Sequence, residues 1–243
     1  MAFVYKRKNK KSYVCAAVVP AAGSSRRTKG IDKLFYQLCG KEILMHTIEK
    51  LEKSEKISEI VIVTREDMIE EVSHLCEKYC VTKVSKVIQG GETRLDSVLE
   101  GVRSLSKNVE YVAVHDAARP FISGKVICEA IEAAVKMGAA APAVPVKDTI
   151  KRARNDIVVE TPQRDELFAV QTPQVFDRDL LLAALSNAVE KNIPVTDDCS
   201  AVEAIGMSVF LTEGDYRNIK ITTPDDFIYA NAIINRDLEG ESF

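Results

Sequence analysis

The sequence has no excess of positive charge and no long apolar run. Its 243 residues include 33 Lys or Arg and 36 Asp or Glu, so the formal net charge is −3. This balance gives no bulk basic field that would attract nucleic acid or an anionic membrane. No apolar run approaches the length of a membrane span, and the first residues lack the apolar core of a signal peptide. We therefore expect a cytoplasmic protein with neither nucleic acid nor a membrane among its partners.

Patterns typical of metal ligands and of catalytic triads are also missing. The six cysteines are scattered, and the one close pair, Cys76 and Cys80, has no second pair at zinc spacing. Free thiols fit a reducing cytoplasm. The three histidines, His46, His74 and His115, form no metal or triad pattern, and His115 is most simply a packing residue at a strand end. Because no nucleophile stands beside a base, we expect chemistry that needs no protein base.

Strands and helices alternate along most of the chain. The length suits one domain, 1–243, with a basic and solvated lead-in at 1–12. Apolar runs predict buried strands, and 3.6-residue periodicity predicts helices between them. The strands are expected at 13–19, 57–63, 84–88, 111–114 and 139–144, and the helices at 42–53, 67–79, from 94 onward and 123–137. This alternation predicts an α/β fold with a mostly parallel, doubly wound sheet flanked by helices.

The pattern changes at Lys147. Two short β-prone runs, 148–152 and 157–160, flank a turn at 154–156, which predicts a β-hairpin. The hairpin is too polar for the core of the sheet, so we expect an arm, 147–172, that projects from the domain. An isolated hairpin is marginally stable in water, so the arm is expected to pack on something. A helix at 177–190, a strand at 207–211 and a last helix capped by Thr223 complete the prediction.

The first strand runs into a loop of small residues that is followed by cations. After Pro20 the chain reads Ala21-Ala22-Gly23-Ser24-Ser25, and Arg26, Arg27 and Lys33 come next. A strand that leads into such a loop presents backbone N–H donors and positive charge to a phosphate chain. The loop is neither a P-loop nor a dinucleotide-binding motif, because the required glycines and lysine are absent. An ordinary strand exit with solvated basic residues is the alternative interpretation.

Further polar segments are expected at the same edge of the sheet, because ligands of open α/β sheets bind beyond the carboxyl ends of the strands. Each segment has a structural alternative: Gly90-Gly91 as a tight turn, Asp116 as a loop cap, and Asp197 and Asp198 as solvated residues. Together they predict a polyanion site. Its cations are Arg27, Lys33, Arg94, Arg119 and Lys220. Transfer of a nucleotidyl group to a phosphate acceptor fits, because a phosphomonoester is already a charged nucleophile at neutral pH.

The motifs together resemble the 2-C-methyl-D-erythritol 4-phosphate cytidylyltransferase family from Val14 to Asn235. The motifs are Pro20-Ala21-Ala22-Gly23, Gly90-Gly91…Arg94…Ser97-Val98, His115-Asp116-Ala117-Ala118-Arg119-Pro120, Asp148-Thr149, Gln171-Thr172-Pro173-Gln174, Thr196-Asp197-Asp198 and Asn218-Ile219-Lys220. The resemblance implies a Rossmann-like nucleotidyltransferase fold and a homodimer joined through the arm. It also implies transfer of CMP from CTP, with Mg²⁺, to 2-C-methyl-D-erythritol 4-phosphate in the non-mevalonate isoprenoid pathway. The products would be 4-diphosphocytidyl-2-C-methyl-D-erythritol and pyrophosphate.

The resemblance also implies roles by position. Four residues are implied as catalytic: Arg27, Lys33, Arg164 and Lys220. The set that faces CTP is Pro20, Ala21, Ala22, Gly23, Gly91, Glu92, Arg94, Ser97 and Ala117. The acceptor set is Asp116, Arg119, Thr149, Arg164, Thr196 and Lys220, with Thr149 and Arg164 contributed by the arm region. Mg²⁺ would be held mainly by the CTP phosphates; its protein ligands stay open, with Asp116 as a candidate.

Two other functions compete with this interpretation. A ribitol 5-phosphate cytidylyltransferase shares most of the motifs, although Ala118 and the run Arg94-Leu95-Asp96-Ser97-Val98 favour the methylerythritol enzyme. A non-catalytic CTP-binding module belongs to a different class, and the intact Arg27, Lys33 and Lys220 oppose it. Pyrophosphate release with each acceptor separates the three.

Overall fold

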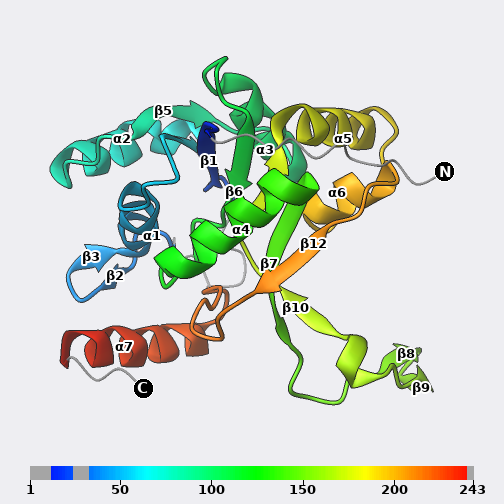
Figure 1. Cartoon of the computed structure of the whole chain (residues 1–243). Coiled ribbons are helices and arrows are strands. Elements are labelled where there is room, and N and C mark those ends of the chain that lie inside the picture. The colour runs from blue at the N-terminus through cyan, green and yellow to red at the C-terminus, as the bar shows by residue number, and fades with distance from the viewer. Residues whose placement is uncertain (1–11, 24–32, 240–243) are drawn as a thin grey trace.

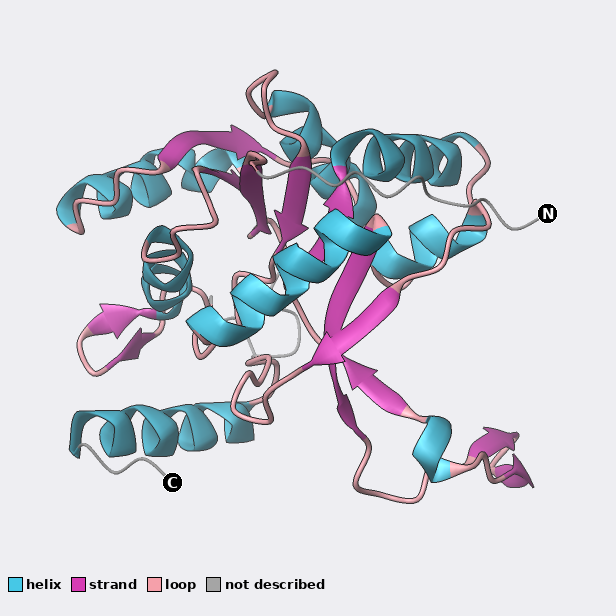
Figure 2. Ribbon diagram, viewed as in Figure 1, coloured by secondary structure: helices cyan, strands magenta, loops and turns pink. Residues whose placement is uncertain are grey.

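A computed structural model describes residues 12–23 and 33–239 of the chain (Figure 1). One large sheet runs through the body, and helices cover both of its faces (Figure 2). The expected α/β fold with a mostly parallel sheet is confirmed. The basic lead-in, apart from Ser12, lies outside the described residues. None of the described helices is both long and apolar enough to cross a membrane.

The sheet is built on five parallel strands. These are β1 (Cys15–Pro20), β4 (Glu59–Thr64), β5 (Val84–Gln89), β6 (Tyr111–Val114) and β7 (Ala139–Pro145). β1 lies at the centre, between β4 and β6, and β5 follows β4 outward. β12 (Phe210–Glu213) pairs with β7 in parallel. The carboxyl ends of all these strands therefore meet at one edge of the sheet.

Two strands run against this direction, and the sequence patterns did not predict them. β11 (Gln174–Asp177) lies antiparallel between β6 and β7, and β10 (Phe168–Val170) pairs antiparallel with the end of β7. Residue Gln174 pairs with Val114, so β11 begins where β6 ends. The predicted strand at 207–211 is displaced to 210–213. A short hairpin of β2 (Gln37–Leu38) and β3 (Lys41–Glu42) and the helix α6 (Asp198–Ala204) were also missed.

Alternate side chains of the central strand enter two separate apolar clusters. Ala17 and Val19 pack with α1 (Ile43–Glu52), α2 (Ile69–Lys78) and α4 (Gly124–Met137). Ala16 and Val18 pack with α3 (Arg94–Ser104), α5 (Arg178–Glu190) and α6. Because the strands are buried on both faces, they read in the sequence as continuous apolar runs. The last helix, α7 (Pro224–Glu239), begins at Pro224 and contributes Ala230 to the first cluster.

Helix α3 lies unusually close to the sheet. A Cβ added at Gly101 would lie 2.4 Å from Val18 Cγ1 and 2.9 Å from Val63 Cγ2, so a larger residue does not fit there. At the helix start, Thr93 and Asp96 form a capping box, and the Thr93 side chain accepts from the Asp96 N–H. The cap and the close packing fix the N-terminus of α3 beside the ends of β1 and β4.

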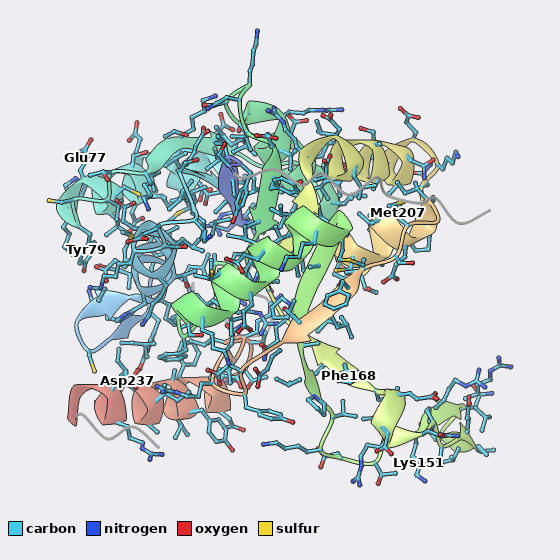
Figure 3. All side chains as sticks on the ribbon, viewed as in Figure 1. Glu77, Tyr79, Lys151, Phe168, Met207 and Asp237 are labelled. Carbon is cyan, nitrogen blue, oxygen red and sulfur yellow. The ribbon has the colours of Figure 1, made fainter. Side chains whose placement is uncertain are left out.

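The predicted hairpin arm is present and projects from the body (Figure 1). It consists of β8 (Arg152–Arg154) and β9 (Ile157–Glu160), joined by Asn155 and Asp156 with φ of 48° and 64°. Two successive residues with positive φ make the tight turn that matches the twist of a hairpin. The first strand of the hairpin, β8, begins at Arg152 and so lies later in the sequence than the expected 148–152. Figure 3 shows Phe168 near the base of the arm and Lys151 farther out.

Candidate active site

A cavity of about 710 Å³ opens at the carboxyl edge of the sheet. Its walls come from the segments that follow β1, β4, β5 and β6, together with Lys33 and Lys220. The lining residues are Pro20, Ala21, Ala22, Gly23, Lys33, Leu34, Thr64, Arg65, Glu66, Gln89, Gly90, Gly91, Glu92, Thr93, Arg94, Ser97, Asp116, Ala117, Ala118 and Lys220. The structure therefore brings together the whole predicted CTP-facing set with two of the predicted acceptor residues, Asp116 and Lys220.

The floor of the cavity is narrow because two loops approach each other closely. The Ala21 N–H donates to Val63 O at 2.6 Å, and the Gly90 N–H donates to Thr64 O at 2.8 Å. A Cβ added at Gly90 would lie 2.6 Å from Ser97 Oγ and 3.1 Å from Ala22 Cβ. Only glycine fits at this position, and the floor is a slot lined by backbone and small side chains. Such a slot suits the flat face and polar edge of a small base.

Asp116 stands at the centre of a cluster of cations beside the cavity. Its carboxylate lies 3.0 Å from Lys220 Nζ, 3.4 Å from Arg119 Nε and 3.6 Å from Arg94 Nη2. Burial raises the pKa of this carboxyl, but the charges of Lys220, Arg94 and Arg119 outweigh it and hold the pKa well below its usual range. The Lys220 side chain remains 40% exposed. Asp116 is thus an ionised carboxylate that holds three cations, of which Arg94 and Lys220 line the cavity.

Arg94 is held from behind by the carboxylate of Asp198, for which a solvated position was the alternative to a place at the site. Its guanidinium donates two hydrogen bonds to Asp198, at 3.1 and 2.8 Å, and the Asp198 side chain is only 1% exposed. Gln174 fixes that carboxylate, because its Oε1 accepts from the N–H groups of Asp198 and Cys199 and its Nε2 donates to Asp197. Asp197 caps α6 in a capping box with Ser200. Both aspartates are therefore structural parts of the site wall.

Two further cations are positioned by backbone carbonyls. Lys33 Nζ donates to Ile221 O at 3.0 Å, which joins the end of the first loop to the segment that carries Lys220. Arg119 Nη1 donates to Asn218 O at 2.7 Å. Burial lowers the pKa of Arg119, although Asp116 opposes the shift. The segment 218–221 therefore presents one lysine to the cavity and orients two other cations through its carbonyl groups.

Arg119, Thr149, Arg164 and Thr196 are not among the residues that line the cavity. Arg27 lies outside the described residues. Thr196 is exposed and lines a neighbouring hollow of about 230 Å³, which also touches Arg94. Thr149 and Arg164 are exposed on the arm, where Arg164 Nη1 donates to Lys147 O at 3.3 Å. Among the described residues of this chain, the arm contributes nothing to the lining of the cavity.

Sequence reasoning missed the wall formed after β4. Thr64, Arg65 and Glu66 line the cavity, and Arg65 Nε bonds Asp67 at 3.1 Å. The signal was available, since β4 was predicted and its end had to lie at the same edge as the other strand ends. The described residues contain no group of three or more His, Cys, Asp or Glu that could hold a metal ion. Asp116 is a carboxylate that lines the cavity, and it lies within 3.6 Å of three cations.

A parallel sheet with a small-residue slot and a cation cluster at its carboxyl edge defines a phosphate-handling enzyme of the nucleotidyltransferase class. The chain belongs to the 2-C-methyl-D-erythritol 4-phosphate cytidylyltransferase family, whose family model matches residues 15–236. It is accordingly a CTP-dependent cytidylyltransferase of isoprenoid biosynthesis that transfers CMP to this polyol phosphate. The predictions of family, fold, activity and acceptor made from the motifs are thereby confirmed.

Relatives and solved structures agree with this assignment. A protein of this name from Clostridium botulinum is 44% identical over 223 residues, which are 91% of this chain and 97% of the relative. One from Halalkalibacterium halodurans is 44% identical over 90% of this chain and 96% of the relative. The crystal structure of a 4-diphosphocytidyl-2C-methyl-D-erythritol synthase from Anaerococcus prevotii superposes with a TM-score of 0.83 at 32% identity, covering 92% and 97% of the two chains. The Thermus thermophilus cytidylyltransferase gives 0.75 at 30% identity, covering 90% and 98%.

Proposed function

We propose that the cavity at the carboxyl edge is where CMP passes from CTP to the phosphate of 2-C-methyl-D-erythritol 4-phosphate. The observation that carries this is the arrangement of Lys220, Arg119 and Arg94 around the ionised Asp116, at the cavity that also holds a slot of small residues. The acceptor phosphate has a second pKa near 6, so it attacks without a protein base. The protein must then align the two substrates and neutralise charge that develops on the phosphates.

Two groups of residues at the cavity bind the two substrates. The slot formed by Ala21, Ala22, Gly90 and Ser97 takes the cytosine, because backbone groups and a short hydroxyl read a pyrimidine edge where a purine lacks room. Lys33, and Arg27 by family resemblance, neutralise the triphosphate. Lys220 and Arg119, which both pair with Asp116, hold the acceptor. In-line attack on the α-phosphate then expels pyrophosphate.

Mg²⁺ is the metal proposed for this site. Proteins commonly bind it through one or two carboxylates and the substrate phosphates, which agrees with a cavity whose described residues include no complete set of metal ligands. Asp116 is the candidate protein ligand, and the ion would neutralise charge on the phosphates of CTP. The proposed location is the cytoplasm, since all six cysteines are free.

The proposed assembly is a homodimer joined through the arm. The arm exposes apolar side chains that a monomer leaves in water: Ile157 is 70% exposed, and Val158, Val159 and Ile150 are also exposed. A two-stranded hairpin that exposes several apolar side chains is marginally stable on its own, so we expect a partner to cover it. A twofold interface would bring the arm of one chain to the cavity of the other, where Thr149 and Arg164 would complete the acceptor site.

Complementation tests the shared site. Lys33→Ala and Arg164→Ala are each expected to be nearly inactive, and they are unfolded and refolded together in equal amounts. If Arg164 acts across the interface, every mixed dimer has one site with both defects and one intact site. Random mixing makes about half of the dimers mixed, so activity should recover to roughly a quarter of wild type. If Arg164 serves its own chain, activity stays at the level of the single variants.

The reaction itself is tested by pyrophosphate release from a panel of nucleoside triphosphates and polyol phosphates. We expect release with CTP and 2-C-methyl-D-erythritol 4-phosphate and a strong preference for CTP over ATP. Equal kcat/KM with ATP would contradict the cytosine slot. A higher kcat/KM with ribitol 5-phosphate would show that this compound is the acceptor instead. If no acceptor caused pyrophosphate release, the protein would be a CTP-binding module without this activity.

A further inference from the structure

A buried hydrogen-bonded chain lies beneath the turn that carries Asp116 and Arg119. The Asp116 N–H donates to Thr172 Oγ1 at 3.1 Å, and Thr172 Oγ1 lies 3.0 Å from His115 Nδ1. On the other side of the ring, His115 Nε2 lies 3.3 Å from Arg119 O. His115 is completely buried, and its own N–H donates to Val18 O on β1. The imidazole therefore bridges the two ends of the turn from below.

The partners fix the direction of every hydrogen bond in this chain. Arg119 O can only accept, so Nε2 of His115 must carry a proton. On the other side of the ring, the Thr172 hydroxyl accepts from the Asp116 N–H and keeps its own proton to donate, so Nδ1 is an acceptor without a proton. The expected tautomer is the one protonated at Nε2.

The turn closed by these bonds is short, and both of its end residues belong to the cation cluster. The Arg119 N–H donates to Asp116 O at 3.1 Å, which closes the turn on itself. The two side chains then form an ion pair with each other, and the Asp116 carboxylate also forms one with Lys220. The imidazole is the group that holds the Arg119 carbonyl, and through Thr172 it also orients the Asp116 N–H. A packing residue of the same volume would fill the space and hold neither end.

We propose that His115 is a positioning residue for the acceptor side of the reaction, because it sets the turn from Asp116 to Arg119 through both of its ring nitrogens. This rests on the proposed function of the cavity. His115 touches no substrate; it acts through Asp116 and Arg119. Small misplacements of groups that orient a substrate reduce rates strongly, about a hundredfold for 1 Å. The effect should therefore fall mainly on the acceptor, because the slot residues Ala21, Ala22, Gly90 and Ser97 lie outside this turn.

The first test is independent of catalysis. Nitrogen NMR of the full chain labelled in its three histidines distinguishes a protonated from an unprotonated ring nitrogen, and His115→Gln assigns the His115 signals. The expected result at pH 7 is a proton at Nε2 and none at Nδ1. A proton at Nδ1 would overturn the arrangement, because Arg119 O would then have no donor. This result stands whether or not the protein transfers CMP.

The second test separates positioning from packing by comparing two variants with a control. His115→Gln places an amide N–H near the position of Nε2, whereas His115→Leu fills the space without a donor. Ser85→Ala is the matched control. It removes a hydroxyl that donates to Glu59 at 2.7 Å near the amino-terminal end of β5, at the edge of the sheet opposite the cavity. Folding of each variant is checked by urea denaturation. Where His115→Leu does not fold, His115→Gln and the NMR measurement decide.

The expected result is a loss of about tenfold or more in kcat/KM for the acceptor in His115→Leu, with the Kd for CTP within about twofold of wild type. His115→Gln should keep at least about a third of the wild-type kcat/KM, and Ser85→Ala should not change it. Three outcomes would each refute the proposal. They are a CTP affinity that falls together with kcat/KM, an equal loss of kcat/KM in both His115 variants, and full activity in His115→Leu. A wild-type protein that releases no pyrophosphate would instead refute the proposed function, and the NMR result would still decide the tautomer.

Discussion

Removing Arg94 should lower the free energy of unfolding by more than the loss of an exposed ion pair would. Arg94→Met keeps the length of the side chain but leaves the Asp198 carboxylate, which is 1% exposed, without its two hydrogen bonds of 3.1 and 2.8 Å. Breaking a buried pair by deleting one partner costs about 3–5 kcal/mol. The Arg94 side chain is 33% exposed, so water reaches part of the site and the lower end applies, about 3 kcal/mol.

The assay is urea denaturation at pH 7, with the thermal midpoint as a second measure. For a chain of this size, about 3 kcal/mol corresponds to a Tm lower by roughly 6–12 °C. The informative control is the double variant Arg94→Met with Asp198→Leu, which replaces both charges with apolar groups. Replacing a whole buried pair is often neutral, so the double variant should recover most of the loss.

Two outcomes would refute this reasoning. One is a loss below about 1 kcal/mol in Arg94→Met, which would mean that Asp198 finds water or another partner. The other is a double variant whose loss equals the sum of the two single losses, which would mean that the two side chains are not coupled.

Three further predictions concern single residues. Lys33→Ala should lower kcat about a hundredfold and change the acceptor KM little, because we expect the lysine to stabilise charge in the transition state. A kcat loss below about tenfold in steady-state kinetics would contradict this role. Lys220→Arg keeps the charge but changes its geometry, so the acceptor KM should rise about tenfold while CTP affinity, measured by calorimetry, is kept; the opposite pattern would reverse the assignment. Burial raises the pKa of Glu42, but hydrogen bonds from its own backbone N–H, Tyr79 and Lys78 lower it overall. Glu42→Gln should therefore lower the free energy of unfolding by about 1–2 kcal/mol above pH 4.5. The difference from wild type should disappear as the pH falls and the carboxyl of the wild type becomes protonated. Urea denaturation that gives the same difference at neutral and at acidic pH would contradict this.

The parallel part of the sheet was predictable because its strands carry a strong local signal. Strands such as β4 and β6 are apolar over their whole length, since both faces are covered, and loops of fixed chemistry follow them. The antiparallel strands gave no comparable signal. β10 has only three residues and all are exposed, while β11 combines Gln174 and Asp177 with two apolar residues. Pairing with distant strands, rather than local propensity, makes these segments strands.

The site was predictable where it depends on strand ends, and unpredictable where it depends on burial. The edge at which Gly90, Asp116 and Lys220 meet follows from the direction of the strands. The burial of Asp198 does not, because its side chain reaches Arg94 across 104 residues of sequence, and only the folded helix pair α3 and α6 brings them together. His115 was expected to be a packing residue. It is buried as expected, but its two hydrogen-bonded neighbours lie in the turn that follows it and at Thr172.

The two ends of the arm have a topological consequence. Phe168 and Pro145 are partners in the register of β10 and β7, so residues 146–167 leave the sheet and return to it between two adjacent positions. Because the excursion is closed at its base, its length and sequence are independent of every other strand register. The free energy of closing a longer loop also grows only slowly with its length. The arm is therefore a module: insertions, deletions or exchanges within it leave the strand registers of the sheet, and the edge that carries the cavity, unchanged.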